Sequence, residues 1–438
     1  MSTHALTKKE RIAIAARWTA AMSSTGVTPL KALAEVLDDD VRTTNLVGKE
    51  AVLNWFKTAP TKSMFKTGTW LEPIVSGDVV KVLSHFDPKA AYHSAAVSIT
   101  VGSSGLITRA TIAISAAPDP LGTVINRVWG PRAGLDRLPD HLGSAYGVKV
   151  NTMKQLDHGV FRVDLAKGGP WIARVFPSDR PVADVKGDAA VLRFLESKDY
   201  PAERCIADVS VHEGQGVLVT RFIAGPKPKP NTANQRKLAD LLARLHTMTG
   251  APKAVRREAG GLHLYTVDCT VGSEIETARA CLQAAAFRGT DKAWDGLSAG
   301  LQKAQGFSSM PKALIHPDPG CVNSISSGGK LVPIDWAGAG YGPRILGLGL
   351  LLVACAAGKT FNPEWTDAIM GAYTKHVTLK PAELDRLDDA IAHRQLIHEA
   401  YSWGVGMATQ RKPMSRKDWP HNNEGIAKMA AHIQETWA

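Results

Sequence analysis

Apolar residues near the N-terminus first recur at spacings of three and four positions and then alternate with polar residues. The first pattern predicts helices at 8–24, 28–37 and 48–57. The second predicts strands at 69–74, 78–86, 93–101 and 106–115. The sequence Gly-Ser-Ser-Gly at 102–105 is a turn signal that joins the last two strands as a hairpin. Helices followed by antiparallel strands indicate an α+β domain.

Three consecutive aspartates, Asp38, Asp39 and Asp40, follow the second predicted helix. Adjacent side chains point in different directions in a helix or a strand, so the three carboxylates do not converge on one point. We therefore interpret them as a solvated helix end and not as a metal site.

Proline and glycine interrupt the pattern after the last of these strands, at 117–120 and 130–131. They predict a linker at 118–135, which makes residues 1–117 a separate domain. A helix at 135–146 is expected to lead into the second domain.

The second domain begins with predicted strands and continues with predicted helices. Strands are expected at 148–156, 160–165, 171–176, 205–211 and 216–222, with a helix at 182–197. The clearest helix, at 235–248, has leucines at 238, 241, 242 and 245. Beyond 345 the chain is expected to be helical, including 390–405 and 425–437. We predict a small antiparallel-sheet lobe at 136–224 and a large, mostly helical lobe at 225–438.

The composition is that of an ordinary globular protein, and it argues against several classes. The longest apolar stretch, at 345–357, is too short and glycine-rich to span a membrane, and the N-terminus lacks a signal-peptide core, so we expect a cytoplasmic protein without a membrane partner. The five cysteines form no Cys-x-x-Cys pair, which argues against a zinc site. The net charge is +11, but the basic residues are scattered, so nucleic acid is not an expected partner.

Three oxygen-bearing side chains lie close together in the stretch 313–336. Asp318 follows His316 by two residues, Asn323 follows five residues later, and Asp335 lies within the apolar run 331–336. We predict short strands at 313–315 and 331–334, joined through a turn at 326–330, which would bring Asp335 beside the loop that holds the other two. Carboxylate and amide oxygens are the ligands that Mg²⁺ prefers, and phosphoryl transfer needs both metal ligands and a carboxylate base.

This stretch resembles the catalytic and metal loops of the aminoglycoside phosphotransferase/choline-kinase family. The family pattern is His-Gly-Asp, an asparagine five residues later, and then Ile-Asp-Trp. The resemblance covers about 145–405 and implies a two-lobed, protein-kinase-like fold that uses ATP and Mg²⁺. It implies that Asp318 is the catalytic base and that Asn323 and Asp335 are the metal ligands.

The resemblance also suggests which small-lobe residues hold the nucleotide. His158 and Gly159 form the turn that would cover the phosphates. Arg174 stands where the family usually has a phosphate-binding lysine, and Asp188, on the helix at 182–197, would pair with it. Thr220 and Phe222 lie at the end of the strand predicted at 216–222. In the family this segment is the hinge between the lobes, whose backbone would pair with adenine.

The N-terminal domain resembles the NTF2-like (SnoaL-like) cone, in which helices close over a curved antiparallel sheet and leave a pocket. The resemblance rests on the order of elements and on the run Val-Gly-Lys-Glu-Ala-Val at 47–52. Candidate pocket residues are Trp55, Trp70, His85, Tyr92 and His93. This resemblance allows a homodimer through the N-terminal domain.

The resemblance implies transfer of the γ-phosphoryl group of ATP to a hydroxyl of a small molecule. The C-terminal tail has few acidic residues after Glu399 and carries Arg411, Lys412, Arg416 and Lys417, which favours a sugar or amino alcohol metabolite over a polycationic antibiotic. Three departures leave a nucleotide-binding pseudokinase or scaffold open as an alternative: Arg174, Pro317 in place of the family glycine, and Gly347 in place of an aspartate that braces the catalytic loop. A third alternative gives the N-terminal domain an isomerase-like or hydrolase-like activity of its own.

Overall fold

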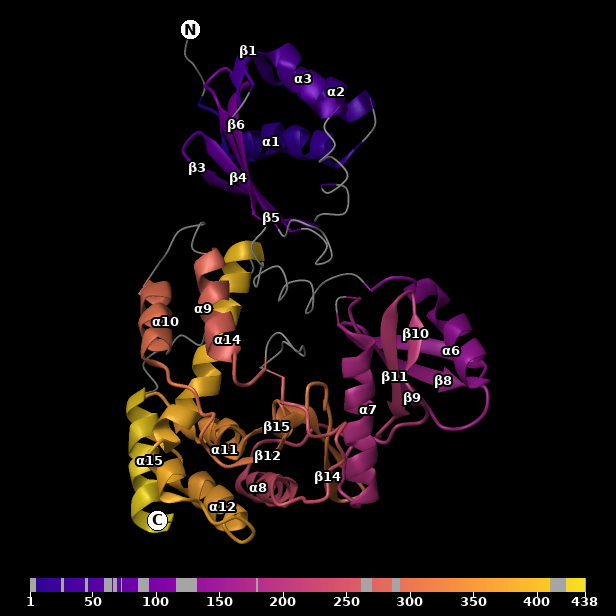
Figure 1. Cartoon of the computed structure of the whole chain (residues 1–438), viewed down its shortest axis with the longest axis vertical. Helices are drawn as coiled ribbons and strands as arrows, with labels where there is room; N and C mark the ends of the chain where they lie inside the picture. The colour runs from indigo at the N-terminus through magenta and orange to yellow at the C-terminus, as the bar shows by residue number, and fades with distance from the viewer. Residues whose placement is uncertain are drawn as a thin grey trace. The chain divides into compact units, whose positions relative to one another are not determined.

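The computed structural model describes residues 5–24, 27–43, 46–58, 65, 69–71, 73–85, 94–115, 132–178, 180–260, 270–285, 292–409 and 423–437. They form two compact units, one built mainly from residues up to 115 and the other mainly from residues after 132 (Figure 1). Most of the predicted linker, up to residue 131, lies outside the described residues.

The described part of the N-terminal unit packs helices on one mixed sheet. The helices are α1 (Lys8–Ser23), α2 (Val27–Ala34) and α3 (Lys49–Thr58). The strands are β1 (Leu37–Arg42), β2 (Thr69–Trp70), β3 (Ile74–Ser76), β4 (Val79–His85), β5 (Ser94–Val101) and β6 (Ile107–Ser115). The order is β1-β6-β5-β4-β2, with β3 also on β4, and β1 is parallel to β6. Trp18 and Met22 of α1 share a core with Val97 and Ile99 of β5, as the apolar pattern predicts.

One prediction for this unit is wrong, because the aspartates at 38–40 lie in strand β1 and not at the end of a helix. Helix α2 already ends at Ala34, and Leu37 and Val41 are buried on either side of the aspartates. Among the strands that the structure describes, β1 is last in the order and pairs with β6, so the acidic residues lie on an edge strand, where charged side chains are common. Aspartate is depleted in strands, which hid this strand from the pattern.

The predicted N-terminal pocket can be placed only in part. Trp55 packs partly against the core, and Trp70 donates its indole Nε1–H to Ser23 Oγ (2.6 Å). Tyr92, His93 and the side chain of His85 lie outside the described residues. The pocket therefore stays a prediction.

The second unit begins with the small lobe, in which a five-stranded antiparallel sheet has the order β10-β11-β9-β8-β7. The strands are β7 (Val150–Asp157), β8 (Val160–Leu165), β9 (Trp171–Val175), β10 (Ser210–His212) and β11 (Gln215–Arg221). Helix α6 (Leu138–Tyr146), which follows a 3-10 turn at Leu135–Arg137, buries Leu138 and Leu142 against this sheet. Helix α7 (Val182–Ser197) has its predicted bounds and packs into the core of the large lobe (Figure 1).

The large lobe is mostly helical, as predicted. Its helices are α8 (Thr232–His246), α9 (Glu274–Ala285), α10 (Lys292–Lys303), α11 (Arg344–Leu352), α12 (Pro363–Tyr373), α13 (Pro381–Leu384), α14 (Leu387–Thr409) and α15 (Asn423–Trp437). Its strands are β12 (Lys312–Ile315), β13 (Ser324–Ser327), β14 (Lys330–Pro333), β15 (Gly340–Pro343), β16 (Ala356–Ala357) and β17 (Thr360–Phe361). In the described part of the chain, every helix is too short or too polar to cross a membrane.

The strand pairing around the predicted site differs from the prediction. β12 pairs with β15, and β14 pairs with β13, whose last two residues were predicted to be part of the turn. The serine-rich composition of β13 concealed it, because the turn itself needs only Gly328 and Gly329, both at positive φ. The predicted approach of the Asp335 segment to the loop is still found. The β13–β14 hairpin places Asn323 opposite Ile334, the residue before Asp335.

Candidate active site

The loop after β12 is fixed by a buried histidine. The Asp318 N–H donates to His316 Nδ1 (3.1 Å), and His316 Nε2 lies 3.0 Å from the Ile334 carbonyl oxygen. Because Nδ1 accepts, these bonds assign the proton to Nε2, which donates to Ile334. Burial lowers the pKa of His316, although Asp335 and Asp318 act in the opposite direction, so the ring is neutral at pH 7. His316 thus ties the Asp318 loop to the strand that leads to Asp335.

Asp318 and Asn323 are brought together as predicted. Asn323 Nδ2 donates to Asp318 Oδ2 (2.7 Å) and to the Asp318 carbonyl oxygen (3.0 Å). A short 3-10 turn, Cys321–Asn323, closes the loop between them. Since the amide nitrogen is bonded to Asp318, the Oδ1 of Asn323 is the atom left to bind a cation.

Asp335 is held in an uncommon backbone conformation beside these residues. Its φ is 68°, in the left-handed region that aspartate tolerates better than most residues. Its N–H donates to Glu203 Oε2 (2.9 Å), and its carboxylate forms an ion pair with Arg174 of β9. The preceding residue, Ile334, donates its N–H to the Asn323 carbonyl (2.9 Å). Contacts on both sides therefore fix where the Asp335 carboxylate points.

The predicted pairing of Arg174 with Asp188 is wrong, since Arg174 pairs with Asp335. Asp188 is instead enclosed by Arg180 (2.7 Å) and Arg257, with the Asp188 and Arg180 side chains 1% and 0% exposed. Asp188 also accepts the Gly338 N–H (2.9 Å), which links α7 to the segment that follows Asp335. The absence of a side chain at Gly187 leaves space for the Arg257 guanidinium. A Cβ at position 187 would overlap that group. These two arginines were not distinguishable from surface residues in the sequence.

Glu203 is a residue of this site that the sequence did not reveal. It lies in the connection between α7 and β10 and is half-buried. Its Oε2 accepts the N–H of Asp335 (2.9 Å). Burial raises the pKa of Glu203, and the charge of Arg174 acts in the opposite direction. No motif in this stretch marks Glu203, because its importance comes from contacts more than a hundred residues away in the chain.

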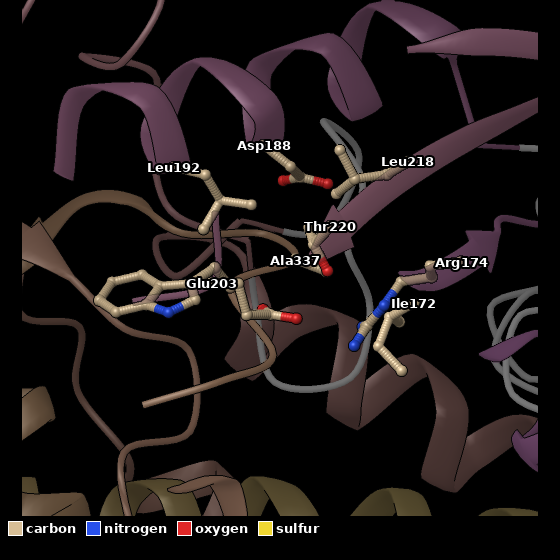
Figure 2. A pocket seen from close by; sticks show the side chains of 9 residues that line it. Ile172, Arg174, Asp188, Leu192, Glu203, Leu218, Thr220 and Ala337 are labelled. Carbon is tan, nitrogen blue, oxygen red and sulfur yellow. The ribbon is translucent and has the colours of Figure 1, made fainter. Parts of the chain in front are cut away.

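A pocket lies between β9, β11, α7 and the segment after Asp335 (Figure 2). It is lined by Ile172, Arg174, Asp188, Leu192, Glu203, Leu218, Thr220, Trp336 and Ala337. Three of the residues predicted to hold a nucleotide, Arg174, Asp188 and Thr220, are thus gathered in one place. Thr220 Oγ1 is buried and has no hydrogen-bond partner among the described residues, which suits a site for a polar ligand.

The other three predicted nucleotide residues lie outside the lining of this pocket. His158 is exposed in the tight turn between β7 and β8. Gly159 has φ 71°, and a Cβ there would lie 2.6 Å from the Val175 carbonyl oxygen, so the glycine is required by packing on β9. Phe222 has the Arg162 guanidinium 4.6 Å above its ring.

The donor atoms at Asn323 and Asp335 suit a magnesium ion. They are an amide oxygen and a carboxylate, both hard oxygen ligands, and the Ile334 N–H donates to the Asn323 carbonyl oxygen, which pairs the backbone beside the two residues. Asn323 and Asp335 would hold the ion, which would neutralise charge on phosphate oxygens.

Gly347 of α11 packs directly against His246 of α8. A Cβ at Gly347 would lie 3.0 Å from His246 Nε2, a nitrogen that has no hydrogen-bond partner among the described residues. His246 Nδ1 is 2.7 Å from the Tyr373 hydroxyl. The position of the expected brace aspartate is therefore filled by the imidazole ring itself, so a simple change of Gly347 to aspartate would not fit.

His246 should make the protein less stable in mild acid. Burial lowers its pKa to about 3, so its stabilising contribution is complete above the unfolded value of 6.5 and is lost as pH falls toward the folded value. We expect a loss of about 2 kcal/mol in the free energy of unfolding between pH 7 and pH 5 from this one residue. Urea unfolding at both pH values tests it, with His246→Gln expected to show a smaller difference than the wild type. If the free energy of unfolding changed equally between pH 7 and pH 5 in both proteins, His246 would not be the source of the acid sensitivity.

A family model described as phosphotransferase enzyme family matches residues 154–388 of the chain. The match spans just over half of the chain, so the chain belongs to this family of phosphotransferase enzymes. The family and enzyme predictions are thereby confirmed, while the NTF2-like resemblance is not. No curated protein matches.

Solved structures resemble the chain at low identity. Amicoumacin kinase hAmiN is 15% identical, with 66% of this chain and 88% of that chain covered and a TM-score of 0.44. An aminoglycoside phosphotransferase from Alicyclobacillus acidocaldarius is 14% identical, with coverages of 70% and 98% and a TM-score of 0.47. Choline kinase LicA from Streptococcus pneumoniae is 14% identical, with coverages of 68% and 98% and a TM-score of 0.44.

Proposed function

We propose that this enzyme transfers the γ-phosphoryl group of Mg²⁺-bound ATP to a hydroxyl group of a small molecule. The observation that supports the proposal is a set of bonds around His316, which links the Asp318 N–H to the Ile334 carbonyl oxygen. Asn323 donates to the Asp318 carboxylate and accepts the N–H of Ile334, the residue before Asp335. Phosphoryl transfer depends mainly on positioning and on charge stabilisation, and these residues supply both.

Each residue of the site has a distinct role in this reaction. Asp318 orients the acceptor hydroxyl and takes its proton as the new bond to phosphorus forms. His316 keeps the Asp318 backbone in place through its Nδ1. Asn323 Oδ1 and the Asp335 carboxylate hold the metal, and Arg174 holds phosphate oxygens. Thr220 Oγ1 is available to the nucleotide from β11, since it lines the pocket without a partner of its own among the described residues (Figure 2).

We propose a sugar or amino alcohol metabolite as the acceptor in preference to an antibiotic. The proposal rests on the excess of basic over acidic residues, 52 against 41, which disfavours a polycationic ligand. The basic stretch that includes Arg411, Lys412, Arg416 and Lys417 lies outside the described residues. A panel of hydroxyl compounds in which kanamycin-type aminoglycosides are the best acceptors would overturn it.

A second candidate is a nucleotide-binding pseudokinase or scaffold. The observation in its favour is the ion pair between Arg174 and Asp335, which places a positive charge on a carboxylate that the metal needs. The N-terminal domain, which we propose spans residues 1–117 with an NTF2-like fold, would then bind the ligand or partner and could join two chains.

Magnesium dependence of nucleotide binding separates the two candidates. We expect Mg²⁺ to tighten ATP binding by about tenfold in the wild type and to have little effect in Asp335→Ala, because that change removes a metal ligand. Isothermal titration with and without Mg²⁺ measures this, and Asp385→Ala, an exposed carboxylate on the large lobe, is the control. ATP binding that is indifferent to both Mg²⁺ and Asp335 would favour the pseudokinase. Absence of binding would direct attention to the N-terminal unit.

A further inference from the structure

Arg174 faces two carboxylates in this site. It forms an ion pair with Asp335, and the Glu203 carboxylate points toward the same guanidinium (Figure 2). The Arg174 and Asp335 side chains are 19% and 32% exposed, so the pair is only partly open to water. Asp335 and Glu203 are also joined directly, through the Asp335 N–H and Glu203 Oε2.

The ion pair conflicts with the role proposed for Asp335. A guanidinium on this carboxylate competes for its oxygen atoms with a divalent cation, and two positive charges side by side repel each other. Arg174 therefore has to leave Asp335, at least in part, when the metal and nucleotide bind. An arginine in a partly buried site needs another acceptor when it moves.

Asp188, the partner expected from the sequence, is not available to receive Arg174. Its carboxylate is already enclosed by Arg180 and Arg257 and bonded to the Gly338 N–H. Glu203 differs from Asp188, since its carboxylate accepts a neutral backbone N–H, that of Asp335, and faces the charge of Arg174. These contacts hold Glu203 in place and leave its charge to be matched by an arginine.

We propose that Glu203 is a positioning residue that receives Arg174 from Asp335 when Mg²⁺ and nucleotide bind. Arg174 would pivot between two carboxylates that are linked to each other, so that Asp335 is freed for the metal while the guanidinium stays aimed at the phosphates. This inference rests on the proposed phosphotransferase function. Glu203, which lies outside α7, thus takes the role of pairing with Arg174 that the sequence suggested for Asp188.

The test compares binding of AMP-PNP with and without Mn²⁺ in the wild type and in Glu203→Gln. Glutamine keeps an oxygen for the Asp335 N–H and removes only the charge. We expect Glu203→Gln to weaken Mn²⁺-dependent binding by about tenfold and to change metal-free AMP-PNP binding by less than about threefold. Titration calorimetry gives the nucleotide affinity, and the electron paramagnetic resonance signal of free Mn²⁺ gives the metal affinity. Glu196→Gln, which removes one partner of a more exposed pair with Arg204 (3.5 Å), is the matched control.

The same change in an Arg174→Ala background separates a relay from a simple structural role. If Glu203 acts by receiving Arg174, its loss should have no effect on metal affinity once Arg174 is absent. An equal tenfold loss in both backgrounds would show that Glu203 merely supports the backbone at Asp335, and the proposal would fall. Wild-type affinity for Mn²⁺ and AMP-PNP in Glu203→Gln would overturn the inference and leave the proposed function intact. Failure of the wild type itself to bind AMP-PNP with Mn²⁺ would overturn both.

Discussion

Replacing Asp318 with asparagine is expected to lower kcat by about a thousandfold while changing ATP affinity by less than about threefold. Asparagine keeps an oxygen that can accept from Asn323 Nδ2, so the loop between β12 and β13 should stay closed. What is lost is the carboxylate that takes the hydroxyl proton. Because Asp318 is not proposed as a ligand of the metal or of the nucleotide, binding should survive.

The measurement is steady-state phosphorylation of the best acceptor found in a hydroxyl-compound screen, together with ATP titration of the same protein preparations. Asp385→Asn, at an exposed position, should retain wild-type kcat. A loss of ATP binding equal to the loss of kcat would show that Asp318 serves the nucleotide. Retention of wild-type kcat would remove Asp318 from the reaction altogether.

Local pattern was sufficient to predict most elements of the second unit and the grouping of its polar residues. Helix α7 has the predicted bounds, Val182–Ser197, because its apolar spacing and flanking proline are read within one stretch of chain. Asp318 and Asn323 meet because five residues and a short 3-10 turn separate them. In both cases the decisive contacts are close in sequence.

The partner of Arg174 could not be predicted in the same way. Asp188 and Glu203 line the pocket beside it, and Asp335 directly precedes Trp336 of the same lining. The choice among these carboxylates depends on where Arg180 and Arg257 direct their charge. Those arginines come from other elements, so the choice is made by tertiary packing and leaves no mark in the local pattern. The β13 strand was missed for a related reason, since its serines are typical of a turn and pairing with β14 overrides that preference.

Replacing Asp188 with alanine is expected to destabilise the second unit by about 3–5 kcal/mol. The change leaves Arg180 and Arg257 facing each other around an empty position, and removes the acceptor of the Gly338 N–H. Breaking a buried ion pair by removing one partner is costly because the other charge stays buried without compensation. Asp188→Asn should lie between alanine and wild type, since its amide oxygen can still accept from Gly338.

Thermal and urea unfolding, followed by circular dichroism and by tryptophan fluorescence, measure the effect. Two compact units make a single two-state transition unsafe to assume, so the two probes are compared before a free energy is assigned. Asp208→Asn is the matched control. Asp208 forms an ion pair with Arg193, which lies on α7 as Asp188 does, but the Asp208 side chain is 90% exposed. Exposed pairs contribute little, so this variant should unfold like the wild type. If Asp188→Ala also unfolded like the wild type, the Arg180–Asp188–Arg257 cluster would not hold α7 against the segment that carries Asp335.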